Sequence, residues 1–222
     1  MIGRVLRLVA RTGGSVRVGG PQRGGGRQRG QALVEFSILL PVFMIVTTGL
    51  LEFGLVFNNH LTLEYATREG ARTGAALADG KGDQATCDTI DAQIVAAVQR
   101  VLDAPGSPID LSSVSNISIW RATASGQPDG SVGIFVWTYT GPNSGPSVDG
   151  KALSYSPPNP LPLTWQPCSR NAGGSTPDSI GVSLAYTYHM ATPLAALLAM
   201  VGGPGATTLP MTDQTVMALN PN

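Results

Sequence analysis

The chain has 222 residues, and its 14 basic and 14 acidic residues give a formal net charge of zero. This length allows one domain with additional segments. Residues 1–30 hold seven arginines and no acidic residue, which is typical of the cytoplasmic flank of a membrane helix. Binding of nucleic acid as the main function is disfavoured, because no aromatic residue is interleaved with these arginines.

The first 57 residues predict a basic leader followed by a membrane-spanning helix. Residues 1–30 are rich in glycine and arginine and are expected to be disordered. Residues 31–57 are almost wholly apolar and exceed the roughly 20 residues that a spanning helix needs. The arginines predict a cytoplasmic N-terminus and an extracytoplasmic body. A cleaved secretory signal is disfavoured, because no A-x-A-like site follows the apolar run.

Two carboxylates, Glu35 and Glu52, interrupt the predicted span. Glu52 lies near its outer end, so we expect it to reach the outer membrane interface rather than form a buried ion site. Glu35 lies near the helix start and has two interpretations. It reaches the lipid headgroups, or, if the chain is cut after Gly30, it pairs with the new amino group of Gln31 in a neighbouring subunit. Physical reasoning alone leaves these two interpretations level.

Residues 58–78 predict a helical stalk that continues the membrane helix without a break. Small residues recur every fourth position along it and form one narrow ridge. Such a ridge lets another element approach the backbone closely. The favoured partner is the protein's own sheet, and a neighbouring subunit is the alternative. The ridge residues are Ala66, Gly70, Gly74 and Ala78.

Residues 79–222 predict an extracytoplasmic α+β domain. Helical periodicity over 88–102 is followed by alternating patterns at 114–121 and 132–140, which predict a hairpin covered on both faces. A strand at 180–189, a short helix at 193–201 and a strand at 207–218 complete the pattern. The fold class is therefore α+β, with the long N-terminal helix packed on a small antiparallel sheet of about four strands.

The segment 141–179 is long and rich in proline, glycine and serine, so we expect a functional or poorly ordered loop. It contains Cys168, and the other cysteine of the chain is Cys87. Both cysteines are predicted to lie outside the cytoplasm, which favours a disulfide over two separate buried thiols. That bond would stabilise the fold by roughly 4 kcal/mol on the chain-entropy model.

No pattern of catalytic, metal-ligating or cofactor-binding residues emerges. The two histidines, His60 and His189, are far apart in the sequence. There is no Cys-x-x-Cys pair and no phosphate-binding or nucleophile motif. We therefore predict that the protein is not an enzyme and has no catalytic residue, metal or cofactor.

The segment Gln31–Ala78 resembles the TadE-like family of the Tad (tight adherence, Flp-type) pilus system. The resemblance lies in Gly30–Phe36, Leu40-Pro41, Gly49–Gly54 and Ala66–Arg72. Ser183–Tyr188 and Thr192–Leu194 near the C-terminus also look like family members.

The resemblance implies a pseudopilin or minor pilin similar to type IV pilins. A prepilin peptidase would cut after Gly30, Gln31 would be the first mature residue, and Glu35, with the neighbouring Phe36, would serve assembly. This favours subunit pairing as the role of Glu35. The implied partners are the lipid bilayer, the peptidase, other pilins or pseudopilins and the Tad inner-membrane platform, with no nucleic acid or small-molecule substrate.

Three functions are therefore carried forward. The first is a single-pass pseudopilin of the cell membrane that takes part in pilus assembly, adhesion or secretion. The second is an uncleaved extracytoplasmic binding or sensor module that uses loop 141–179 for recognition. The third, a membrane-anchored enzyme, is disfavoured because no catalytic set is present.

Overall fold

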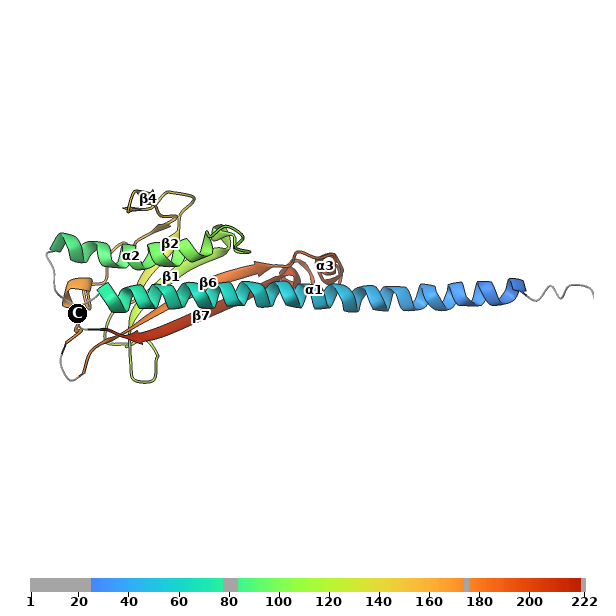
Figure 1. Cartoon of the computed structure of the whole chain (residues 1–222), viewed down its shortest axis with the longest axis horizontal. Helices are drawn as coiled ribbons and strands as arrows, with labels where there is room; N and C mark the ends of the chain where they lie inside the picture. The colour runs from blue at the N-terminus through green and yellow to red at the C-terminus, as the bar shows by residue number, and fades with distance from the viewer. Residues whose placement is uncertain (1–24, 78–83, 174–175, 221–222) are drawn as a thin grey trace, which may run out of the picture. The chain divides into compact units, whose positions relative to one another are not determined.

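The computed structural model describes residues 25–77, 84–173 and 176–220, and its first element is the long helix α1 (Gly25–Leu77; Figure 1). α1 begins inside the segment predicted to be disordered, because residues 27–29 are arginine and glutamine, which favour helix. The rest of the predicted leader, residues 1–24, lies outside the described residues. The chain divides between Met44 and Ile45 into two compact units.

α1 contains the candidate membrane span. The segment Gly30–Leu77 includes a stretch that is long and apolar enough to cross a membrane, by length and composition. Its large apolar side chains are exposed, as with Phe43 at 66% and Phe53 at 70%. Exposed apolar surface on this scale marks a contact with lipid or protein. The helix fits a single-pass membrane protein.

The second unit contains an antiparallel sheet of five strands in the order β5-β2-β1-β6-β7. The predicted α+β class, with a long helix on an antiparallel sheet, is confirmed. The sheet has one strand more than predicted, because Tyr155 in the predicted loop pairs with Tyr139. The strands are β1 (Val114–Ala122), β2 (Phe135–Tyr139), β5 (Tyr155–Ser156), β6 (Ser179–His189) and β7 (Thr208–Ala218).

The C-terminal half of α1 and the helix α2 (Gln84–Leu102) pack closely with β6. A Cβ atom on Gly70 would lie 2.5 Å from Val98 Cγ2, and one on Gly74 would lie 2.6 Å from Ile180 Cδ1. Gly70 and Gly74 of the ridge therefore face β6 of the protein's own sheet, the favoured partner, and also α2, which was not a predicted partner. The other members of the ridge are Ala66, which is fully buried, and Ala78, which lies outside the described residues.

The two faces of β2 differ in burial, which corrects the prediction of a hairpin covered on both sides. Phe135 and Trp137 are buried, whereas Val136 is 36% exposed. On β1 the same outer face is closed by Trp120, whose indole lies over Gly181 of β6. A Cβ atom on Gly181 would lie 2.3 Å from Trp120 Cε2, so this position requires glycine.

The predicted loop 141–179 is partly regular. It contains a two-stranded hairpin of β3 (Ser147–Val148) and β4 (Lys151–Ala152), then β5, and then the 3₁₀ turn η2 (Pro167–Ser169). Elements this short carry no detectable alternation, so the sequence pattern could not predict them. The connection between β6 and β7 holds the short helix α3 (Leu194–Gly202) and the 3₁₀ turn η3 (Pro204–Thr207).

Candidate functional site

The predicted processing and assembly residues lie together on the first turns of α1. Gly30, Gln31, Glu35 and Phe36 are all exposed. The Gln31 side-chain amide donates a hydrogen bond to Glu35 Oε1 over 3.0 Å, which places residues 31 and 35 one turn apart on one face. Cleavage after Gly30 and pairing of Glu35 between subunits stay predictions.

Glu52 forms a buried polar site in the second unit. Its side chain is 4% exposed and accepts three hydrogen bonds from the end of β6 and the residues that follow it. The Tyr188 hydroxyl donates to Oε1, the Ala191 backbone N–H donates to Oε1 over 3.1 Å, and the Thr192 backbone N–H donates to Oε2 over 3.0 Å. We call these four residues the Glu52 site.

The Glu52 site corrects the expectation that this carboxylate does not form a buried site, because its side chain is enclosed by donors of the same domain. A carboxylate at low exposure is stabilised when donors satisfy both of its oxygens, and here three donors do so. Burial and the hydrogen bond to Glu52 raise the pKa of the Tyr188 hydroxyl above its ordinary value. The site joins α1 to a segment about 140 residues later in the chain.

Two further contacts hold the C-terminal strand against α1. The Thr67 hydroxyl donates to an oxygen of Asp213 on β7 and lies 3.0 Å from the Thr215 hydroxyl. The Asn220 backbone N–H donates to the Ala75 carbonyl oxygen over 3.0 Å. Together with the Glu52 site, these contacts are spread along the C-terminal half of α1, so they fix the helix to β6 and β7.

A disulfide and a buried ion pair attach the end of the predicted loop to α2. Cys87 and Cys168 are bonded, with their Cα atoms 5.1 Å apart. Arg170 Nη2 donates to Asp91 Oδ2 over 3.0 Å, and the guanidinium carbon lies 4.3 Å from the Trp165 ring centre. Sequence reasoning missed the ion pair, although an acidic residue one helical turn after Cys87 and a basic residue two positions after Cys168 were the available signal.

A cleft of about 640 Å³ lies beside this attachment. Its lining includes residues of α2 and the aromatic residues Phe135 and Trp137 of β2. It also includes residues of the β3–β4 hairpin and Pro157, Leu161 and Pro167 of the proline-rich segment. The cleft is mostly apolar, as small-molecule and peptide sites are, and Asp91 on its wall is already paired with Arg170.

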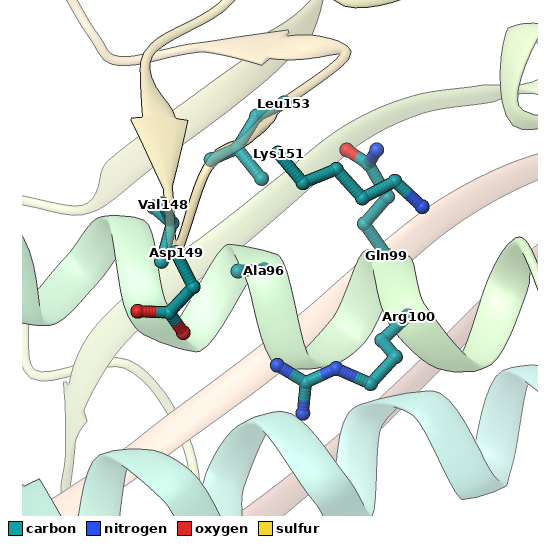
Figure 2. Close-up of a pocket in the computed structure, with 7 residues that line it drawn as sticks. All are labelled: Ala96, Gln99, Arg100, Val148, Asp149, Lys151 and Leu153. Carbon is teal, nitrogen blue, oxygen red and sulfur yellow. The ribbon is translucent and has the colours of Figure 1, made fainter.

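A smaller hollow of about 200 Å³ lies between α2 and the same hairpin (Figure 2). Figure 2 shows Arg100 on α2 below Asp149 and Lys151 of the hairpin. Lys151 Nζ donates to Asp103 Oδ2 over 2.7 Å, and the Gln99 side-chain oxygen accepts from the Ser154 backbone N–H over 2.9 Å. These contacts attach the hairpin to α2 and include no nucleophile with an adjacent base.

The two histidines, His60 on α1 and His189 at the end of β6, are exposed. Within residues 30–77, 84–173 and 176–220, no group of three or more His, Cys, Asp or Glu side chains could hold a metal ion. Several of the polar groups that the fold brings together attach α1 and α2 to the sheet and its connecting segments.

The fold and these attachments define an α+β protein whose described residues include one candidate membrane helix, and the C-terminal part of that helix forms part of the domain core. Residues 30–72 match the family model described as TadE-like protein, which confirms the resemblance predicted from the sequence. The matched segment includes the predicted span at 31–57, Glu35, Glu52 and two of the four ridge residues, Ala66 and Gly70. No significant match to a curated protein or to a solved structure was found.

Proposed function

We propose that this protein is a membrane-anchored, non-enzymatic pseudopilin or minor pilin that takes part in assembly of a Tad pilus or a related secretion apparatus. The observation that carries the proposal is the TadE-like match over residues 30–72, because it begins at Gly30 and runs through the candidate span. This family suggests a Tad pilus-related role.

The architecture of the second unit supports the same function. α1 is unbroken from its exposed apolar part to the part that packs on the sheet. Within this unit, α1 carries both exposed apolar side chains such as Phe53 and residues such as Ala66 that are buried in the domain core. The anchor would lie in the cell membrane, with the N-terminus cytoplasmic and the domain extracytoplasmic.

The proposed role of Glu35 follows from its position relative to the new N-terminus. Cleavage after Gly30 would place an amino group on Gln31, one helical turn from Glu35. An amine and a carboxylate at the start of an apolar helix are costly in lipid unless they are paired. When subunits stack, Glu35 of one subunit pairs with the amine of the next, which sets the register of assembly.

Intact-mass measurement of the full chain, expressed with and without a prepilin peptidase, tests the processing step. We expect a mature chain that begins at Gln31 only when the peptidase is present. The variant Gly30→Leu should keep its full mass in both cases. An intact wild-type N-terminus in the presence of the peptidase would contradict the proposed processing.

Co-purification of pilus components tests the assembly step. Glu35→Ala should insert in the membrane normally but recover less of the other pilins and of the inner-membrane platform. The matched control is Glu64→Ala, which removes an exposed carboxylate paired with Arg68 on the same helix. If both variants recover as much partner as the wild type, Glu35 only contacts the headgroups.

The cleft of about 640 Å³ favours a second candidate function, an uncleaved single-pass binding or sensor module. Its lining includes proline and leucine side chains from the segment predicted to act in recognition. The mass measurement separates the two candidates, since the second requires an uncleaved N-terminus. Normal assembly after substitution of Trp137 in the cleft would favour the first.

A further inference from the structure

The segment between β6 and β7 is unusually apolar for an exposed connection. Residues 190–212 contain no Asp, Glu, Lys or Arg. α3 lies in the middle of this segment and has no buried residue. Three of its large side chains are exposed, namely Leu197 at 48%, Met200 at 86% and Val201 at 91%. Exposed apolar residues grouped in this way mark a surface that contacts something other than water.

The Glu52 site fixes where this surface lies along α1. Ala191 and Thr192, which precede α3, donate their backbone N–H groups to the Glu52 carboxylate. The residues on either side of Glu52 are Leu51, 60% exposed, and Phe53, 70% exposed. The start of α3 is therefore held at the level of exposed apolar residues that belong to the candidate membrane span.

Because the start of α3 lies at the same level along α1 as Leu51 and Phe53, the same surroundings contact all three. A bilayer that covers Leu51 and Phe53 reaches the level of Ala191, so α3 meets the same lipid boundary. With nine residues α3 is about 14 Å long, too short to cross a hydrocarbon core of about 30 Å. We propose that α3 is a second membrane contact, a short helix whose Leu197, Met200 and Val201 side chains insert into the outer boundary of the bilayer that α1 crosses.

The proposal explains why a carboxylate in an apolar helix is tied to a backbone turn. A turn at the membrane boundary has N–H groups that lipid cannot satisfy, and irregular backbone is not tolerated where it faces hydrocarbon. Glu52 accepts hydrogen bonds from two of these N–H groups, and the same hydrogen bonds stabilise its buried carboxylate. The proposal rests on the membrane anchoring by α1 that is part of the proposed function, and it adds a contact that a single spanning helix does not require.

Site-directed fluorescence in vesicles tests the proposal. An environment-sensitive fluorophore is attached to Met200→Cys in the full chain, with Cys87 and Cys168 left in their disulfide. The protein is reconstituted in phosphatidylethanolamine and phosphatidylglycerol vesicles, with or without lipids brominated in the acyl chains. Leu50→Cys, 69% exposed in the candidate span, is the lipid-facing reference, and Leu163→Cys, 91% exposed in the proline-rich segment, is the water-facing one.

We expect brominated lipid to quench the fluorophore at Met200 and at Leu50 but not at Leu163. Val201→Cys repeats the measurement if the Met200 variant does not fold. If brominated lipid quenches the fluorophore at Leu50 but, as at Leu163, not at Met200, the proposed α3 contact is overturned. Membrane anchoring by α1 would still hold in that case. A Met200 fluorophore shielded from aqueous iodide but not quenched by lipid also overturns it, since a protein surface then covers α3. No quenching at Leu50 would refute membrane anchoring itself, and the α3 contact with it.

Discussion

Replacing Glu52 by alanine should detach the β6–α3 segment from α1. The substitution leaves three donors without their acceptor, namely the Tyr188 hydroxyl and the backbone N–H groups of Ala191 and Thr192. A hydrogen bond to a charged group contributes about 1.5–3 kcal/mol, and a buried donor left unpaired costs about 1–3 kcal/mol. These contributions overlap and do not simply add. We therefore expect the free energy of local unfolding of this region to fall by about 3–5 kcal/mol.

Tyr188→Phe isolates one of the three bonds. It removes the hydroxyl but keeps the ring and both backbone donors, so we expect a loss of about 1.5–3 kcal/mol. Glu64→Ala is the control on the same helix, because the exposed Glu64–Arg68 pair contributes at most about 1 kcal/mol. The expected order of destabilisation is Glu52→Ala, then Tyr188→Phe, then Glu64→Ala.

Hydrogen exchange of the full chain in detergent, followed by mass spectrometry, measures this region directly. A loss of about 3 kcal/mol corresponds to roughly 100-fold faster exchange through local opening. We expect that acceleration in peptides that cover Ala191 and Thr192 in Glu52→Ala, and a smaller one in Tyr188→Phe. Exchange in Glu52→Ala that matches the Glu64→Ala control would refute the reasoning, since the three bonds would then contribute nothing.

Three other predictions concern the packing, the disulfide and one carboxylate. Gly70→Ala should lower the free energy of unfolding by up to about 2 kcal/mol in urea titration, because overpacking against Val98 exceeds the gain in helix propensity. The control is Gly54→Ala, which should not lower the free energy of unfolding, because no atom lies within 4 Å of the Cβ position. Replacing Cys87 and Cys168 by serine should cost about 4 kcal/mol by the same titration, given their separation of 81 residues, and an unchanged urea midpoint would contradict this. Hydrogen bonds from the Ser131 hydroxyl and backbone N–H, and from Arg121, lower the pKa of Asp129 to about 2. The contribution of Asp129 to stability is therefore complete at pH values above its ordinary pKa near 3.8 and is lost as the pH falls through about 2. An NMR titration of Asp129 with a midpoint near 3.8 would disprove these hydrogen bonds.

The sequence predicted the elements whose periodicity extends over several turns or residue pairs. The helical pattern of α2 and the alternation in β1, β6 and β7 each repeat often enough to be recognised. Strand β5 has two residues and carries no such repeat. The outer face of β2 was misjudged because apolar residues at alternate positions, such as Val136, indicate burial only on average.

The contacts of the candidate site were harder to predict because they join distant parts of the chain. Glu52 was recognised as an exception to the apolar pattern, but the partner segment begins 136 residues later, at Tyr188. The local sequence pattern of each segment gives no indication that the two segments are in contact. The disulfide was favoured from the expected compartment alone, whereas the neighbouring Arg170–Asp91 pair carries no compartment signal.

The strand order β5-β2-β1-β6-β7 also has a consequence for the timing of folding. The donors to Glu52, the Asp213 partner of Thr67 and the Asn220 donor to the Ala75 carbonyl all belong to β6, β7 or the segments next to them. β6 and β7 follow α1 by about 100 residues or more in the chain, and contacts over such sequence separations form late. α1 is therefore synthesised well before the residues that complete these hydrogen bonds, so Glu52 lacks these three donors until β6 and the residues after it have been made.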